Sequence, residues 1–387
     1  MDEQDYIVCD SDESVKKLAS ELSALDENDV IALDTEFERS KTFFPTAAML
    51  QLRFGARTYL ADPIKADINE VIAGLCKTRA VVLMYSASED LEVISLLARR
   101  ARIKPELPSR IVDLQLMSAF LGKTFMQGLA KCVSEELGIT LLKSETHSDW
   151  LSRPLTSSQL VYAALDVRYL DEIYKRYLKR FNDNDPRLRW FYMAMEDMRK
   201  ETLSETDPFD LYRQVTGAGS LDRKALERLR FLCSKRYIFA MENNVALNRV
   251  ITGRALCPIA ERTPLTFQGL ASCGMNWGAV REHGKLVIDW IKESLSLPGD
   301  SVLPAYDAFS PGRTMKSGSE GIKYALSKAA QTSGICPELI ATKKLINDWF
   351  YAKRTGGSPR LSSGWYKECV GDLDLKRTSK KTKANGP

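Results

Sequence analysis

Two acidic residues near the N-terminus, Asp34 and Glu36, stand where they could bind a metal ion. They follow four apolar residues at 30–33, two of them β-branched, and this pattern predicts a strand over 30–37 that is buried on both faces. Side chains alternate along a strand, so the two acids point to the same side. Two carboxylates in one place repel each other unless a cation lies between them, and a divalent cation is the usual solution. The alternative is that Asp34 caps a turn and Glu36 is solvated.

A third acid, Asp90, follows a second predicted buried strand at 80–85. Ser86 and Glu89 have the spacing of a capping box, which predicts that a helix begins here with Asp90 in its first turn. Proteins that alternate strands and helices place their sites just beyond strand ends, which is where Asp90 is expected. The alternative is an acid that only stabilises a helix N-terminus.

A fourth acid, Asp166, is paired with Tyr162 on a predicted helix. Thr156 and Gln159 form another capping box, which opens a helix that runs to about residue 180. Residues four apart share one face of a helix, so Tyr162 and Asp166 point the same way. A tyrosine that packs on the core is the alternative for Tyr162, and the acid one turn later argues against it.

The elements that must position these residues alternate between strands and helices up to residue 180, which predicts a mixed α/β sheet domain. Residues 48–54 and 57–61 form a predicted hairpin, and with 30–37 they make an antiparallel meander. Helices are predicted at 13–26, 66–77, 110–120 and 126–137, and a polar, turn-rich loop at 143–154.

The strand pattern disappears after residue 180, and helices are predicted from there on. The predicted organisation is a sheet domain at 1–181, a linker helix at 182–206, a helical domain at 207–296, a linker rich in Pro, Gly and Ser at 297–317, a second helical domain at 318–373 and a basic, disordered tail at 374–387. Residues 1–180 have a net charge of −5 and residues 181–387 a net charge of +9. This asymmetry suits a metal-binding domain followed by modules that bind a polyanion, and chance asymmetry is the alternative.

Composition excludes several classes of protein. The N-terminus has no secretory pattern, and no apolar run approaches the ~20 residues of a membrane helix, so we expect no membrane contact. The eight cysteines are scattered without a C-x-x-C pair, which argues against a zinc site and a disulfide framework and favours the reducing cytoplasm. The two histidines, His147 and His283, exclude most histidine-based metal sites.

The acidic motifs resemble those of the DEDD superfamily of 3′-to-5′ exonucleases, in the subclass that has a tyrosine in the third motif. The first motif is Asp34-Thr-Glu-Phe-Glu-Arg-Ser-Lys-Thr-Phe-Phe-Pro45 with Leu50-Gln-Leu52, the second is Ser86-Ala-Ser-Glu-Asp90-Leu-Glu, and the third is Tyr162-Ala-Ala-Leu-Asp166-Val-Arg-Tyr-Leu170. The block Lys143-Ser-Glu-Thr-His-Ser-Asp-Trp-Leu-Ser-Arg-Pro-Leu155 narrows the match to the bacterial ribonuclease D family. Residues 207–296 and 318–373 look like two HRDC helical modules, so the resemblance covers almost the whole chain.

The resemblance implies both a fold and an activity. The fold is a mixed-sheet, ribonuclease H-like exonuclease domain followed by two all-α domains. The activity is that of a metal-dependent 3′-to-5′ exoribonuclease that releases nucleoside 5′-monophosphates and trims tRNA precursors and other structured RNAs. The helical modules would bind the RNA, and the protein would be a cytoplasmic monomer. The physiological RNA, the metal used in the cell and the arrangement of the helical domains are not implied.

The resemblance also assigns roles to the site residues. Two Mg²⁺ or Mn²⁺ ions would be held by carboxylates, as Mg²⁺ prefers. Asp34 would bridge both ions, Glu36 and Asp166 would complete the site of the attacking water, and Asp90 would act on the second ion. Tyr162 would orient the water. Apart from the resemblance, Thr35 and Phe37 flank the acids and are therefore expected to contact the terminal sugar and base. The alternative for Phe37 is a core position.

The sequence departs from the family at one position, and two other functions stay open. Many relatives have histidine where this chain has Tyr85, a position outside the metal ligands, so we expect activity to survive. His147 is expected to be a loop or RNA-contact residue.

The alternatives to an exoribonuclease are a DNA-directed exonuclease of the same superfamily and a catalytically silent nucleic-acid-binding protein. The complete set of four acids and one tyrosine argues against the silent protein.

Overall fold

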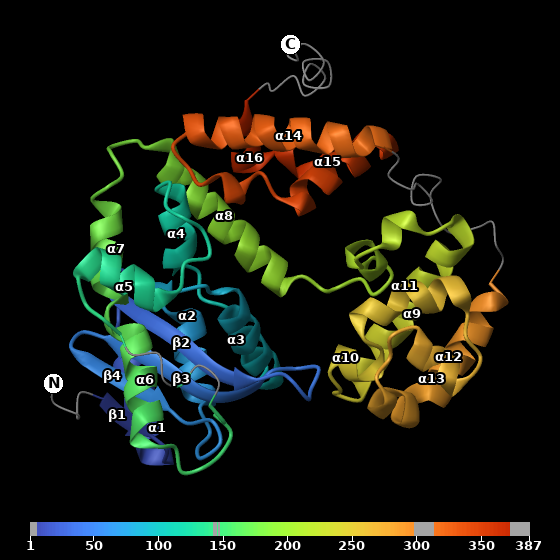
Figure 1. Ribbon diagram of the computed structural model, residues 1–387. Coiled ribbons are helices and arrows are strands. Elements are labelled where there is room, and N and C mark those ends of the chain that lie inside the picture. The colour runs from blue at the N-terminus through green and yellow to red at the C-terminus, as the bar shows by residue number, and fades with distance from the viewer. Residues whose placement is uncertain (1–5, 142–144, 146–147, 298–312, 372–387) are drawn as a thin grey trace.

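The sheet domain is built on one mixed sheet. The computed structural model describes residues 6–141, 145, 148–297 and 313–371. In these residues the sheet has six strands in the order β1-β4-β3-β2-β5-β6 (Figure 1). The strands are β1 (Tyr6–Cys9), β2 (Val30–Glu38), β3 (Thr46–Phe54), β4 (Arg57–Ala61), β5 (Val81–Met84) and β6 (Ile111–Asp113). Strands β2, β3 and β4 form the predicted antiparallel meander, whereas β1, β5 and β6 pair in parallel with their neighbours.

Helices cover both faces of the sheet, because strand alternation gives each face its own apolar side chains. The helices of the sheet domain are α1 (Asp12–Ser23), α2 (Asn69–Lys77), α3 (Ser88–Arg100), α4 (Leu114–Phe120), α5 (Leu129–Leu137), α6 (Ser157–Arg168) and α7 (Leu170–Leu178). Leu33 and Leu52 join the main core with α1, α2 and α3. On the other face, Met49 and Leu60 pack with Ala163 of α6, which crosses the sheet (Figure 1).

Three local predictions in this domain are wrong. Residues 110–120 form a strand and a helix, because Asp113 ends β6 and caps α4 by accepting the N–H groups of Gln115 and Leu116. The helix predicted to run from 156 to 180 is divided at Tyr169. The capping box at Ser86 does not form, because Ser86 has a left-handed backbone (φ 67°) and α3 begins at Ser88.

Past residue 113, the described residues contain helices and no strand. The predicted fold class, a mixed-sheet domain followed by all-α structure, is therefore confirmed. The helices are α8 (Pro186–Leu203), α9 (Arg223–Glu242), α10 (Leu247–Val250), α11 (Gly253–Arg262), α12 (Phe267–Ser272), α13 (Trp277–Leu295), α14 (Arg313–Thr332), α15 (Lys343–Thr355) and α16 (Gly364–Val370). Short 3-10 helices lie at Leu211–Gln214, Ala218–Ser220, Pro337–Leu339 and Arg360–Ser362. No described helix is both long enough and apolar enough to span a bilayer.

The helical part packs as two groups with different cores. Helices α9 to α13 enclose a hydrophobic core of their own. Helices α14 to α16 share the core of the sheet domain, through α8 and α4, and the rings of Phe120 and Trp365 lie 5.0 Å apart. The domain boundaries given above stay a prediction, and the proposed tail at 374–387 and most of the linker at 297–317 lie outside the described residues.

The loop between β2 and β3 connects the sheet domain to helices α9 and α10 (Figure 1). Ala246 donates its N–H to the carbonyl of Lys41 at 3.1 Å, and the side-chain oxygen of Asn244 accepts the N–H of Phe44 at 3.1 Å. The ring of Phe43 packs edge-on against Tyr237, with centroids 5.1 Å apart. The strand that carries Asp34 and Glu36 is therefore held at its far end by the helical region.

Candidate active site

Three of the predicted acids meet where β2 passes under α6. Asp34, Glu36 and Asp166 each offer a carboxylate oxygen, and these oxygens all lie within 4.8 Å of one another. Alternation along β2 places Asp34 and Glu36 on the face that α6 covers, and the last turn of α6 carries Asp166 over them. The pairing with β3 shifts in register between Glu36 and Phe37, immediately after the second acid, and then continues to Glu38. The structure thus brings together residues more than 130 positions apart in the sequence.

The fourth acid, Asp90, approaches from the other face of the sheet. One of its oxygens accepts both the N–H of Thr35 (3.1 Å) and the Thr35 hydroxyl (2.5 Å), and Asp90 is only 6 % exposed. Thr35 lies between the two acids of β2, so its side chain points away from them and toward α3. Strand β2 therefore presents the carboxylates of Asp34 and Glu36 on one face and holds the carboxylate of Asp90 through Thr35 on the other face. Asp90 lies outside the group of three close oxygens.

A residue that the sequence analysis missed, Asp113, shapes the turn that delivers Asp90. Its carboxylate accepts the N–H groups of Ser86 and Ala87, each at 3.0 Å, and it also caps α4. These bonds hold Ser86 in its left-handed conformation, from which α3 begins two residues later. The sequence carried only a weak signal for it, because Asp113 follows two apolar residues, Ile111 and Val112, whereas Asp34 follows four.

Asp90 is buried, the other three acids are half-buried, and their closeness and limited access to water change their protonation. Burial raises the pKa of Asp34 well above its usual value, and the charges of Asp90, Asp166 and Glu36 raise it further. Burial and the neighbouring Asp166 and Asp90 raise the pKa of Glu36 to about 8. Burial raises the pKa values of Asp90 and Asp166 to about 7, although hydrogen bonds from Thr35 and Tyr162 act in the opposite direction. Such a group of oxygen donors, costly to ionise together, fits hard divalent cations such as Mg²⁺ or Mn²⁺.

Tyr162 lies one turn before Asp166 on α6, and its hydrogen bond lowers the pKa of that carboxyl group. The predicted capping box of Thr156 and Gln159 forms and starts this helix. The ring of Tyr162 packs at 6.0 Å, tilted by 44°, against the buried ring of Trp150. The tyrosine thus packs against the core and is also bonded to Asp166. Core packing and a place beside the acid, the two alternatives from the sequence, are therefore both true of Tyr162.

The loop that carries Trp150 is fixed to the sheet by Arg153. Its guanidinium group binds both oxygens of Asp62, at 2.6 and 2.8 Å, and donates to the carbonyl groups of Ala48 and Trp150, each at 2.7 Å. Both partners are nearly buried, which makes these charge-assisted bonds strong and directional. This anchor places Trp150 against Tyr162.

The other predicted residues lie around the acids in different ways. Phe37 is half-buried on β2 directly after Glu36. Tyr85 donates its hydroxyl to the carbonyl of Gln127 at 2.7 Å, so it joins the end of β5 to the segment before α5 and lies outside the acidic cluster. His147 falls outside the described residues.

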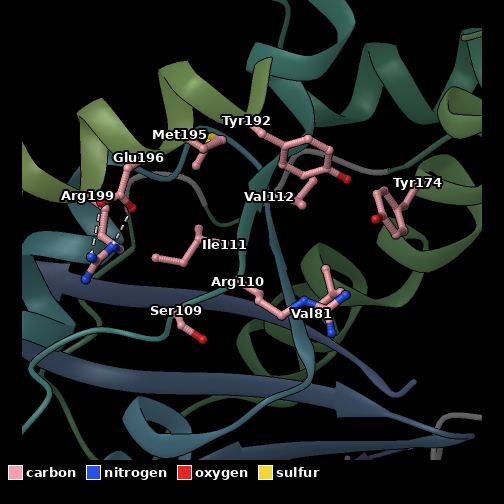
Figure 2. A pocket seen from close by; sticks show the side chains of 10 residues that line it. All are labelled: Val81, Ser109, Arg110, Ile111, Val112, Tyr174, Tyr192, Met195, Glu196 and Arg199. Atoms are coloured by element: carbon pink, nitrogen blue, oxygen red, sulfur yellow. Dashed lines mark hydrogen bonds and ion pairs between the residues drawn. The ribbon is translucent and has the colours of Figure 1, made fainter. Parts of the chain in front are cut away.

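A separate cavity of about 300 Å³ lies at the opposite end of the parallel strands (Figure 2). Val81 and Ile111, which open β5 and β6, form one wall, and Tyr174 and Tyr192 of α7 and α8 form another. An ion pair between Arg199 and Glu196 (2.9 Å) closes one side. The acids lie toward the other ends of these strands, and none of the predicted site residues lines this cavity.

The raised pKa values predict how pH acts on the metal-free protein. A carboxyl group whose pKa is higher in the folded than in the unfolded state keeps its proton on folding, so the free energy of unfolding falls as pH rises from about 5 to 8. A divalent ion relieves this repulsion, so Mn²⁺ should raise the melting temperature more at pH 8 than at pH 6. Thermal unfolding in EDTA and in Mn²⁺ across this range measures both effects. An Asp34→Asn, Glu36→Gln protein should lose most of this pH dependence, and a pH dependence equal to that of wild type would contradict the prediction.

Comparison with known proteins gives three concordant results. A family model described as a 3′-5′ exonuclease matches residues 6–181. Ribonuclease D of Escherichia coli (strain K12) is 31 % identical over 365 residues, covering 92 % of this chain and 94 % of that protein, and ribonuclease D of Serratia proteamaculans (strain 568) is 33 % identical over 346 residues, covering 87 % and 89 %. The crystal structure of E. coli RNase D, described as an exoribonuclease involved in structured RNA processing, superposes with a TM-score of 0.80 at 29 % identity, covering 96 % of this chain and 98 % of that one.

Proposed function

Because this chain belongs to the ribonuclease D family and is a 3′-to-5′ exoribonuclease, we propose that it removes nucleotides one at a time from structured RNAs, tRNA precursors especially. The products are nucleoside 5′-monophosphates. Water adds to the phosphorus of the last phosphodiester bond, the bond from phosphorus to the 3′ oxygen breaks, and the shortened RNA leaves with a free 3′ hydroxyl. The observation that carries this proposal is the meeting of three carboxylate oxygens within 4.8 Å.

The exonucleases of this family use divalent metal ions, and we propose two Mg²⁺ or Mn²⁺ ions for this chain. Asp34, Glu36 and Asp166 would hold them, with Asp90 acting on the second ion from the other face of β2. Bound there, the ions would supply a nucleophilic water at neutral pH and neutralise charge on the phosphoryl oxygens. The donor set supports this, because it consists of half-buried carboxyl groups whose pKa values are raised by desolvation and by the charges of neighbouring acids.

The protein's own residues supply orientation. Tyr162 is bonded to Asp166, and its phenol can place the attacking water by a hydrogen bond. A tyrosine has a pKa of ~10, so it is suited to holding a water and not to deprotonating it. Phe37 and Thr35 are proposed to contact the terminal base and sugar. The Thr35 side chain is buried on the opposite face of β2 and its hydroxyl binds Asp90, so a sugar contact of Thr35 would come from its main chain.

Further features support our proposals on RNA binding, on the cellular compartment and on the oligomeric state. The net charge of +9 over residues 181–387 suits helical modules that bind RNA phosphates, and such binding weakens steeply with salt. All eight cysteines are free thiols and most are buried, as expected for a protein of the reducing cytoplasm. We propose a monomer, because strand β2 and helices α3 and α6 of one chain supply every acid of the site.

The test is the degradation of a 3′-labelled tRNA precursor. With Mg²⁺ or Mn²⁺ the label should leave as a 5′-mononucleotide, and EDTA or Asp166→Ala should stop its release. A matched DNA oligonucleotide should be degraded much more slowly, and the opposite preference would favour the DNA-directed exonuclease. Should wild type bind the RNA and release nothing with either metal, the catalytically silent alternative would be correct.

A further inference from the structure

The side chain of Gln51, in the middle of β3, has an amide group that the fold leaves without a partner. Gln51 is 0 % exposed, and neither its side-chain nitrogen nor its side-chain oxygen makes a hydrogen bond among the described residues. Buried amides nearly always make hydrogen bonds, because a buried amide without a partner has lost its hydrogen bonds to water and gained none in their place. An amide at this position therefore needs a partner in the working protein.

The neighbours of Gln51 identify that partner. On one side it is paired across the antiparallel ladder with Asp34 of β2, and on the other side with Leu60 of β4. Directly opposed side chains point to the same face, and their Cβ atoms lie roughly 4.5–5.5 Å apart. Leu60 is apolar and so is Met49, the next residue of β3 on this face. Asp34 is thus the polar side chain directly opposite Gln51, and Arg53, the other neighbour on this face of β3, is bonded to Thr58 at 2.8 Å.

An amide suits the task of holding this carboxylate. A glutamine can donate an N–H to one oxygen of Asp34 and leave the lone pairs of the other oxygen free for a cation. A lysine or arginine in the same place would bring a positive charge that competes with the cation. The groups bonded to metal-binding side chains commonly set the affinity of such sites, typically by 10–100-fold.

We propose that Gln51 is a positioning residue, whose amide hydrogen-bonds the Asp34 carboxylate and holds it in the orientation that binds the metal ion. This inference rests on the proposed function, since it takes Asp34 as a metal ligand. It extends the proposed function, because it gives a role to Gln51, a residue of the sheet that is not proposed to contact the substrate or the ions. It also gives the unpaired amide its missing partner.

The test compares Gln51→Leu with Met49→Leu, a substitution on the same strand and face, beside Glu36. Mn²⁺ alone is titrated into each EDTA-treated, RNA-free protein, and free Mn²⁺ is measured by electron paramagnetic resonance. The dissociation constant of Gln51→Leu should rise about 10-fold. Its melting temperature in EDTA should stay near that of wild type, because leucine fills the buried space and the half-buried Asp34 can bond to water instead. Met49→Leu should change neither quantity.

A residue that is only structural would give a different result. If Gln51→Leu binds Mn²⁺ as wild type does, the proposed role is overturned while the proposed function stands. If wild type itself binds no Mn²⁺, the metal site fails and the role of Gln51 fails with it. Gln51→Met, of similar length and without a donor, should repeat the 10-fold loss, so a poor fit of leucine alone cannot produce the expected result. With RNA present, the loss should appear in kcat at subsaturating Mn²⁺, with KM for RNA unchanged.

Discussion

Replacing Asp34 by asparagine should lower kcat by about three orders of magnitude while making the metal-free protein more stable. Asp34 is the most crowded acid of the site, since burial and the charges of Asp90, Asp166 and Glu36 all raise its pKa. An asparagine of the same shape removes the repulsion but also removes a proposed metal ligand, and a lost charge-stabilising interaction of this kind typically costs 10²–10³-fold or more. Exonuclease assays with Mn²⁺ and thermal unfolding in EDTA measure the two opposite effects.

Glu38→Gln is the matched control for this experiment. Glu38 is the third acid of β2, but its carboxylate is bonded to Ser40 at the exposed end of the strand and lies outside the acidic cluster. Its replacement should leave kcat near that of wild type. Residues that act as a unit are not additive, so Asp34→Asn combined with Asp166→Ala should be little worse than either change alone. Full activity of Asp34→Asn would contradict the assignment of the site.

The parts of the site that local rules govern were predictable from the sequence. Alternation along a strand grouped Asp34 with Glu36, and helical spacing grouped Tyr162 with Asp166. Both pairs form as expected, and the meander of β2, β3 and β4 places the first pair under α6. The same alternation also assigns Thr35 to the opposite face of β2, where its hydroxyl binds Asp90.

The parts that depend on distant contacts were not predictable in this way. Nothing local marks Ser86 for a left-handed backbone, because the conformation depends on hydrogen bonds to Asp113, 27 residues away. Strand β6 has three residues, too few for a period to show, and its apolar residues merge with those of α4. Gln51 gave no signal beyond its place in a motif, because its burial beside Asp34 depends on the pairing of β2 with β3.

The arrangement of the helical region is also set by contacts that no sequence window contains. Cys336 donates its N–H to the carbonyl of Ala119 at 2.8 Å, so the segment before α15 is bonded to α4 of the sheet domain. Phe43, in the loop that follows β2, packs into the core of α9 to α13. Both helical groups therefore contact elements that directly follow strands of the sheet. RNA bound by the helices would then lie next to the domain that carries the proposed active site.

Replacing Tyr162 by phenylalanine should lower kcat about 10²-fold and leave KM for RNA and the affinity for Mn²⁺ at pH 8 nearly unchanged. The phenol is proposed to orient the attacking water, and the loss of such positioning typically costs about 10²-fold. The ring remains, so its packing against Trp150 is preserved. Single-turnover assays with saturating Mn²⁺ measure the loss.

The pH dependence separates this role from simple packing. The hydrogen bond from Tyr162 lowers the pKa of Asp166, so its loss should raise that pKa above about 7. Protons then compete with Mn²⁺ at higher pH, and the fall in Mn²⁺ affinity on acidification should begin at a higher pH in Tyr162→Phe than in wild type. Tyr169→Phe, seven residues later at the junction of α6 and α7, is the matched control and should show neither change. A Tyr162→Phe enzyme within twofold of wild type in kcat would show that the tyrosine only packs against Trp150, and the role in orienting water would have to be given up.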